Sequence, residues 1–437
     1  MSFFNKYGRP ALWAFLIYMP FADTVTYAIA GGNVLFNFAK DIFYIIALIG
    51  IIELWQKQRL FLSAAKPLAA PLGVLLGTCA VTLILANGNP QLAAPASEHP
   101  ILMGIIGLKA LIWYIPLILC GYYLIRDKQD LFFLTRLHVI LALTCCGLGF
   151  MQYLLLATGV CPSTRSYIGD ELFKASLNAR CFVGGSLIFN PELGLIRLPG
   201  TFFSPLQWGW FLMANSFFTF ASAVTDPVRR WRLVSFAALA CVFFSGVISG
   251  QKIVLLFLPP MLIILLNISS GVNLFKRLIL LSAGILTLLT IWTVTPDSVS
   301  NLNSFFASEL IVSQSHQPIN EMPGLLGKGL GRATEAASLF GQTQLIASYY
   351  RKVLYELGLF GFFGIIGLVS TVSFLTFQAY HAASDRSLRR LGVCLWVFIL
   401  FISYNTYYSP LDVDPVAVYY WLFAGVLFKL PQLDEDW

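Results

Sequence analysis

The sequence predicts an all-α, polytopic integral membrane protein with about 12 transmembrane helices. Of its 437 residues, 58% are hydrophobic and only 11% are charged, whereas an average soluble domain has about 25% charged residues. The apolar residues form long blocks, and each membrane-spanning helix needs about 20 mostly apolar residues. This composition excludes a water-soluble globular protein, a disordered tail and a nucleic-acid-binding module.

Apolar stretches bounded by polar residues, Gly or Pro define the predicted spans. They lie at residues 11–29, 33–54, 67–86, 101–125, 131–158, 201–225, 233–250, 252–270, 277–297, 347–378, 390–407 and 415–430. The first is followed by Gly31 and Gly32 and then directly by the second, not by an A-x-A cleavage site, so we interpret it as a retained anchor. Residues 1–437 therefore form a single predicted transmembrane domain.

The distribution of Lys and Arg predicts the orientation. If the N-terminus is cytoplasmic, 17 of the 28 basic residues fall on inner segments, nine fall on outer segments and two, Lys40 and Lys109, fall within spans. The three short outer loops, 30–32, 87–100 and 408–414, contain no Lys or Arg. This asymmetry follows the positive-inside rule and predicts that both termini are cytoplasmic.

Two long external loops, 159–200 and 298–346, are predicted to carry function, because structureless loops of more than about 15 residues usually do. The first holds Cys161 and Cys181, which are candidates for a disulfide if that side faces an oxidising compartment. The other six cysteines fall within predicted helices, where they act as small apolar residues. No C-x-x-C or H-E-x-x-H pattern occurs, so we predict no metal site.

Charged residues at the outer side are the main candidates for a site. They occur in four places: Arg197 in Ile196-Arg197-Leu198-Pro199-Gly200-Thr201-Phe202, Lys252 after Ser249-Gly250-Gln251, Arg332 in Gly327-Lys328-Gly329-Leu330-Gly331-Arg332, and Arg351 at the start of the tenth span. Each place alone fits a basic residue that grips lipid phosphate. Together, and against the orientation rule, they favour an anionic substrate approached from outside, since Arg and Lys suit phosphate oxygens.

Two lysines lie inside predicted spans and have two open interpretations. Lys40 and Lys109 either pair with an acidic side chain, such as Asp41 or Asp23, or contact substrate directly. Aromatic residues near the outer boundary, Trp208, Trp210, Tyr349 and Tyr350, either anchor the protein at the interface or contact sugar.

At these residues the chain resembles the O-antigen polymerase and O-antigen ligase family of bacterial envelope glycosyltransferases. The resemblance covers roughly residues 33–365. It rests on Lys40-Asp41, Tyr114-Ile115-Pro116-Leu117, Arg197-x-x-Gly200-Thr201-Phe202 with Pro205, Ser249-Gly250-x-Lys252, Gly327-x-Gly329 and Glu356-x-Gly358-x-x-Gly361. The resemblance implies that Arg197, Lys252, Arg332 and Arg351 are catalytic cations and that Lys40, Lys109, Tyr350 and Glu356 contact substrate.

One departure separates the two branches of this family. Ligases carry a His-Asn pair about nine residues before the Glu-x-Gly motif, and here Ala347 and Ser348 stand at those places. This favours a polymerase of exopolysaccharide, capsule or O-antigen repeats over a ligase. It also leaves the general base open, because His316, Glu335 and Glu309 lie in the second long loop but no spacing selects one of them.

The resemblance implies a metal-independent reaction without a cofactor at the outer face of the bacterial cytoplasmic membrane. Both substrates are lipid-linked oligosaccharides on undecaprenyl pyrophosphate, and the cations stabilise the charge that grows on the departing pyrophosphate. Membrane lipid and a chain-length regulator or export complex are further implied partners. The rival class is a secondary transporter with twelve helices. Carriers built from two six-helix halves often have a long cytoplasmic linker after the sixth span, whereas here that linker, 226–232, is short. A polysaccharide export partner or flippase is a third class.

Overall fold

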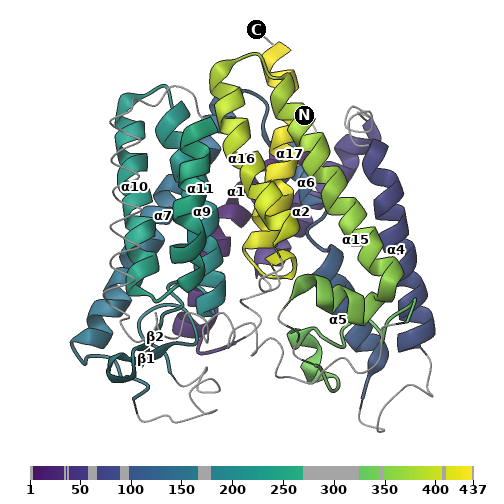
Figure 1. Cartoon of the computed structure of the whole chain (residues 1–437), viewed down its shortest axis with the longest axis horizontal. Helices are drawn as coiled ribbons and strands as arrows, with labels where there is room; N and C mark the ends of the chain where they lie inside the picture. The colour runs from purple at the N-terminus through teal and green to yellow at the C-terminus, as the bar shows by residue number, and fades with distance from the viewer. Residues whose placement is uncertain are drawn as a thin grey trace.

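The computed structural model describes residues 3–33, 36, 39–57, 66–88, 98–165, 179–268, 324–344, 346, 348–405 and 410–435. These residues are mostly helical, and the helices stand side by side in a bundle (Figure 1). Seven described helices are long and apolar enough to cross a membrane: Lys66–Asn87, Pro100–Leu124, Lys128–Ala157, Arg229–Ile248, Tyr349–Ala382, Arg386–Tyr404 and Val416–Asp434. Each matches one predicted span, so the chain is a helical membrane protein.

Of the other five predicted spans, four are helical but fall short of this length or apolar content, and one lies outside the described residues. The first is a run of short helical pieces, η1 (Phe4–Gly8), α1 (Arg9–Tyr18), η2 (Met19–Phe21) and η3 (Thr24–Ile29). The second is α2 (Ala39–Lys57), which carries several charges, the sixth is α9 (Pro205–Thr225), and the eighth is α11 (Lys252–Ile268). The predicted span 277–297 lies outside the described residues.

Two predicted spans are interrupted in the structure. Span 101–125 consists of α5 (Pro100–Ile112) and α6 (Leu117–Leu124), separated by a turn. Pro116 explains this break, because it has no N–H and its ring clashes with the carbonyl four residues earlier, that of Ile112. The helix α15 (Tyr349–Ala382) is broken at Gly358, whose φ of 71° lies in the left-handed region. Both breaks fall beside sequence motifs described above.

The centre of the bundle is formed by α9 and α17 (Val416–Glu435). Helix α17 packs against α6, α15 and α16 (Arg386–Tyr404), and α9 packs against α7 (Lys128–Ala157), α10 (Arg229–Ile248) and α16. The apolar window of α17 is 83% buried, whereas that of Lys66–Asn87, which includes η5 (Lys66–Leu68), α4 (Ala69–Thr82) and η6 (Leu83–Asn87), is 28% buried. Helix α9 begins with a capping box in which Ser204 and Gln207 satisfy each other's backbone N–H groups, followed by Pro205.

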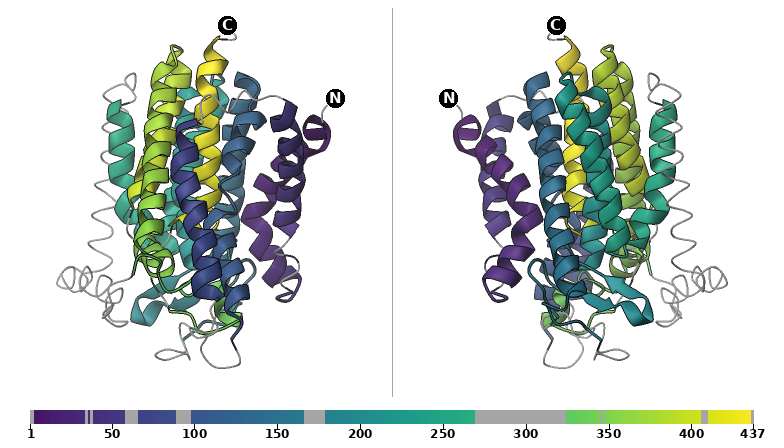
Figure 2. Two further views of the ribbon diagram at one scale, coloured as in Figure 1. Left: turned by 90° about the vertical axis from the view of Figure 1, so that its right-hand side faces the viewer. Right: turned by 90° about the vertical axis from the view of Figure 1, so that its left-hand side faces the viewer.

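The two ends of the bundle differ. Both ends of the chain lie at the upper end in Figures 1 and 2, whereas a small sheet lies at the lower end, which we call the loop end. The sheet pairs β1 (Ile188–Asn190) with β2 (Leu195–Arg197) in antiparallel register, Ile188 opposite Arg197, with η8 (Pro191–Leu193) between them. The described part of the second long loop, 324–344, also lies at the loop end and contains η9 (Glu335–Leu339).

Candidate functional site

The loop-end segment around Arg197 docks on the turn that precedes Lys252. The N–H of Leu198 donates to the Ser249 carbonyl over 3.2 Å, and Nε2 of Gln251 donates to the Leu198 carbonyl over 3.0 Å. Gly250 has a φ of 64°, and a Cβ added there would collide with the Ile196 carbonyl oxygen. The structure therefore brings these two motifs together. Arg197 is half-buried on β2; Lys252 starts α11, and its side chain lies outside the described part.

Trp208 is an interior residue that joins the same two motifs. Its Nε1 donates to the Ser249 hydroxyl over 3.2 Å, and a Cβ on Gly200 would lie 2.5 Å from its ring. Trp208 and Trp210 are 1% and 0% exposed. The interpretation of these two residues as interfacial anchors or sugar contacts is therefore wrong.

A second pair of motifs interlocks at the start of α15. The N–H of Lys328 donates to the Tyr355 carbonyl over 2.8 Å, and the N–H of Gly329 donates to the Glu356 carbonyl over 3.1 Å. A Cβ on Gly327, whose φ is 63°, would lie 2.6 Å from the Glu356 carbonyl group. The glycines of both motifs thus let two backbones approach where α15 breaks at Gly358.

Glu356 holds this loop through its side chain as well. Its buried Oε1 accepts hydrogen bonds from the Ala333 N–H at 2.7 Å and from the Thr334 hydroxyl at 3.1 Å. In the structure Glu356 therefore orders the segment that carries Arg332.

The two predicted cations of this region have different surroundings. Nη1 of Arg332 lies 3.0 Å from Oε2 of Glu98, whose side chain is 3% exposed. Oε1 of Glu98 also accepts the Gln342 N–H at 3.0 Å. Arg332 is therefore fixed in place and its charge is balanced by Glu98. Arg351, in contrast, is exposed on the first turn of α15.

Lys40 and Lys109 both form ion pairs. Nζ of Lys40 lies 2.6 Å from Oδ2 of Asp414, which also accepts the Tyr114 hydroxyl at 3.1 Å. Nζ of Lys109 lies 2.8 Å from Oδ2 of Asp41. The pairing interpretation fits both contacts, and for Lys40 the partner is Asp414, which sequence reasoning did not consider.

Tyr350 points into the bundle. It is 8% exposed, and its hydroxyl donates to the carbonyl of Ser403 on α16. Tyr349 is 2% exposed. Two residues after Tyr350, the Lys352 ammonium pairs with Asp412 in η10 (Pro410–Asp412). The first turn of α15 thus presents Arg351 outward and two tyrosines and a lysine inward.

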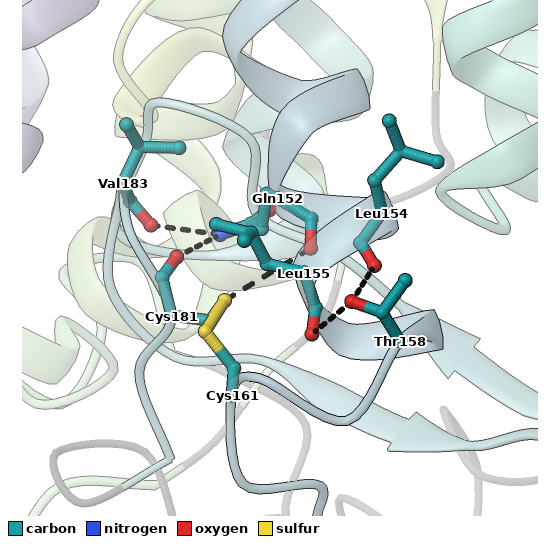
Figure 3. Close-up of a disulfide and its surroundings, with 7 residues drawn as sticks. All are labelled: Gln152, Leu154, Leu155, Thr158, Cys161, Cys181 and Val183. Carbon is teal, nitrogen blue, oxygen red and sulfur yellow. Dashed lines mark hydrogen bonds between the residues drawn. A yellow bond between two sulfur atoms is a disulfide. The ribbon is translucent and has the colours of Figure 1, made fainter.

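A disulfide closes the first part of the first long loop, and a side chain of α7 holds that part to the bundle. Cys161 and Cys181 are bonded, with their Cα atoms 5.6 Å apart (Figure 3). Gln152 at the end of α7 donates through Nε2 to the carbonyls of Cys181, at 3.1 Å, and Val183, at 2.7 Å. These contacts place the loop over α7 and next to the β1–β2 sheet.

Sequence reasoning missed three acidic residues that form ion pairs with Arg332, Lys352 and Lys40. Glu98, Asp412 and Asp414 lie in two of the loops predicted to be outer, 87–100 and 408–414, which lack Lys and Arg. Each balances a basic residue elsewhere: Arg332, Lys352 and Lys40, respectively. An acidic residue in a loop without basic ones was the available signal. Within the described ranges, no group of three or more His, Cys, Asp or Glu residues could hold a metal ion.

A comparison with models of known protein families gives no match, and a comparison with curated proteins gives none either. The fold and the site define a helical membrane protein whose loop end gathers paired and exposed cations around glycine-rich motifs.

Proposed function

We propose that this protein is a membrane glycosyltransferase that polymerises undecaprenyl-pyrophosphate-linked oligosaccharide repeats into exopolysaccharide, capsule or O-antigen. The observation that carries the proposal is the packing of its motifs. The Arg197 motif docks on the Gly250 turn, and the Gly327 motif docks on the Glu356 motif, all at the loop end. Motifs that are far apart in sequence therefore meet pairwise at one end of the bundle.

The proposed topology has twelve spans, with both termini in the cytoplasm and the loop end at the outer face of the cytoplasmic membrane. Two features support it. Both ends of the chain lie at the end of the bundle opposite the β1–β2 sheet (Figures 1 and 2). The Cys161–Cys181 bond lies on the loop-end side, and disulfides persist mainly in oxidising compartments outside the cytoplasm.

In the proposed reaction a sugar hydroxyl of one lipid-linked repeat attacks the anomeric carbon of another. The bond from that carbon to the phosphate oxygen breaks, and negative charge grows on the pyrophosphate. The proposed cations for this charge are Arg351, which is exposed, Arg197, which is half-buried, and Lys252, which follows the turn on which the Arg197 segment docks. Glu98 already balances the charge of Arg332 and holds this side chain in place, so the proposed contribution of Arg332 is its fixed position.

The remaining predicted contacts take supporting roles in this proposal. The Lys40–Asp414 and Lys109–Asp41 pairs brace α2 against α5 and the segment before α17, and Glu356 orders the loop beneath Arg332. The polyprenyl tails lie in surrounding membrane lipid. A chain-length regulator or an export complex is the proposed protein partner, and transfer to another acceptor by a ligase is the alternative within the same chemistry.

A secondary transporter is a second candidate because one observation favours it. The two lysine pairs lie among the helices, and ionisable groups inside a membrane protein often mark an ion or proton pathway. A carrier moves its solute without changing it, so the two candidates differ in their products.

The test uses the purified full-length protein in phospholipid vesicles with a lipid-linked repeat as substrate. We expect longer glycans on gels, and expect Arg197→Ala, Lys252→Ala and Arg351→Ala each to shorten or abolish them. Arg229→Ala is the matched control for Arg351, since both are exposed arginines on the first turn of a helix. Full-length polymer from both the Arg197 and Lys252 variants would exclude the proposed phosphate site. Solute uptake without glycan growth would establish the carrier instead.

A further inference from the structure

An open groove lies between η3 and the part of the first long loop that contains the disulfide. Its volume is about 360 Å³, which is in the range of small-molecule sites in proteins. Tyr27 lines the groove from η3, and Arg180, Phe182 and Gly184 line it from the loop. The groove is therefore large enough for a small ligand and combines one cation with two aromatic rings.

Arg180 brings a positive charge into this groove. Its Nη1 donates to the carbonyl of Tyr27 over 2.5 Å, which fixes the guanidinium beside η3. Among the residues that the structure describes, no Asp or Glu side chain forms an ion pair with Arg180. Arg165 of the same loop, in contrast, pairs with Glu192 at 3.4 Å. A guanidinium presents five N–H donors, two of which fit the oxygens of a carboxylate, so the groove favours an anionic group.

Phe182 is held in a strained turn beside Arg180. Its φ is 61°, and the N–H of Val183 donates to the carbonyl of Cys181 over 2.7 Å, so these three residues form a γ-turn. A γ-turn with positive φ at its centre is rare and strained, above all for a bulky residue. Gln152 holds the carbonyls on both sides of Phe182, and Cys181 is bonded to Cys161 (Figure 3). Strain that the surroundings impose in this way is typical of ligand sites.

The strained turn keeps a large apolar ring in solvent. Phe182 is 52% exposed, whereas Cys181 and Val183 on either side are 3% and 4% exposed. Glycine would adopt this backbone without strain, so the turn itself does not require phenylalanine. The second ring of the groove belongs to Tyr27, which is half-buried and packs against Phe203 with the ring centroids 4.9 Å apart.

The groove adjoins the motif that carries Arg197. A Cβ on Gly184 would lie 2.2 Å from the Gly200 carbonyl oxygen, so the two backbones are in contact. The hydroxyl of Thr24 joins the same segments, because it accepts the Gly184 N–H at 3.1 Å and donates to the Thr201 carbonyl at 2.8 Å. A ligand in the groove would therefore lie beside the segment that forms part of the proposed phosphate site.

We propose that this groove binds a carboxylated sugar residue of the acceptor glycan. The guanidinium of Arg180 binds the carboxylate, and the rings of Phe182 and Tyr27 pack on the C–H groups of the sugar, because the face of an aromatic ring carries partial negative charge. A lipid phosphate would use the cation alone and leave both rings without a role. The inference rests on the proposed function in taking the sugar to belong to the acceptor, and it assigns that acceptor to the acidic glycans.

The experiment measures the binding of labelled tetrasaccharides to the full-length protein in phosphatidylcholine nanodiscs. The probes are the tetramers of galacturonate and glucuronate and the neutral tetramers of galactose and glucose. We expect at least one acidic probe to bind about tenfold or more tighter than its neutral counterpart, as a charge-assisted hydrogen bond provides. Arg180→Gln is expected to remove this preference. Arg165→Gln, which removes the same charge from the same loop, is the matched control and should retain it.

A second variant separates binding from folding. Phe182→Gly removes the ring and relieves the positive φ, so we expect weaker binding of the acidic probe together with an equal or higher melting temperature. Val160→Ala, which shortens another exposed apolar side chain of the loop, should bind as the wild type does. A purely structural Phe182 would instead give Phe182→Gly a lower melting temperature and unchanged binding by the folded fraction.

Three results would overturn the inference. They are equal binding of acidic and neutral probes by the wild type, equal binding by Arg180→Gln and Arg165→Gln, and displacement of the acidic probe by an equal concentration of glycerol phosphate, which would assign the groove to a lipid headgroup. Binding requires no elongation, so the two proposals can fail separately. A wild type that elongates glycans but shows no acidic preference refutes only this inference, and one that binds acidic probes but elongates nothing refutes the proposed function.

Discussion

Arg332 donates a hydrogen bond of 3.0 Å from its Nη1 atom to Oε2 of Glu98, a residue 234 positions earlier in the chain. This buried pair joins the segment before α5 to the described part of the second long loop. Because the Glu98 side chain is 3% exposed, its negative charge depends on Arg332 for compensation. Arg332 therefore has a role in stability that is separate from any role in catalysis.

The first prediction concerns this pair. Arg332→Ala leaves Glu98 buried without a partner, so we expect it to lower the free energy of unfolding by about 3 kcal/mol. The double variant Arg332→Ala with Glu98→Ala is expected to recover most of that loss. Thermal unfolding in detergent checks both. A double variant that is no more stable than the single one would show that Arg332 is held by something other than Glu98.

The second prediction concerns the contact between the loop and α15. Gly327→Ala places a Cβ 2.6 Å from the Glu356 carbonyl group, in a left-handed backbone that costs about 1–2 kcal/mol for any residue with a side chain. We expect a lower melting temperature and faster proteolysis of the loop. Gly324→Ala is the matched control, because a Cβ there would meet nothing within 4 Å. Equal behaviour of the two variants would mean that this close approach does not exist in solution.

The third prediction concerns the disulfide. Mass spectrometry of the unreduced protein is expected to find one peptide pair linked through Cys161 and Cys181. Replacing both with Ser is expected to lower stability by about 3 kcal/mol, as for a crosslink that closes a loop of roughly this length. The six other cysteines are free in the structure. Full alkylation of Cys161 without reductant would contradict the bond.

The fourth prediction concerns topology. Gly194 lies in the exposed turn between β1 and β2, so a reporter inserted there interrupts no helix. We expect a reporter that matures only outside the cytoplasm to be active at Gly194. The same reporter fused after residue 435 is expected to be inactive, and a cytoplasmic reporter at that position is expected to be active. Activity of one reporter at both places would contradict the proposed orientation.

The fifth prediction concerns acid stability at the end opposite the sheet. Burial would raise the pKa of Asp385, but hydrogen bonds from Lys128 and Ser387 outweigh it, and its pKa is lowered. The ionised form is thus favoured in the folded protein, and its contribution is present above the unfolded pKa and lost as pH falls through the folded pKa. We expect Asp385→Asn to reduce the loss of melting temperature on acidification; an unchanged slope would contradict this.

Hydropathy predicted seven of the spans because length and apolar content are local properties. The break at Pro116 could have been predicted from the proline alone, whereas that at Gly358 could not, since its left-handed backbone is set by the Gly324–Gly327 segment packed against it. The site was predicted less completely. Charge patterns identified Arg332 and Lys40 as exceptional, but their partners, Glu98 and Asp414, are brought near only by tertiary packing.

The central positions of α9 and α17 have a consequence for how this sequence can vary. A helix with one side in lipid can exchange Leu, Ile, Val and Phe on that side with little effect, because lipid has no fixed shape to match. The Lys66–Asn87 helix, 28% buried, has such freedom; α17, 83% buried, contacts protein on nearly every side. In a library of apolar substitutions, tolerated changes should therefore concentrate on the peripheral helices, while α17 should reject even changes that preserve hydrophobicity.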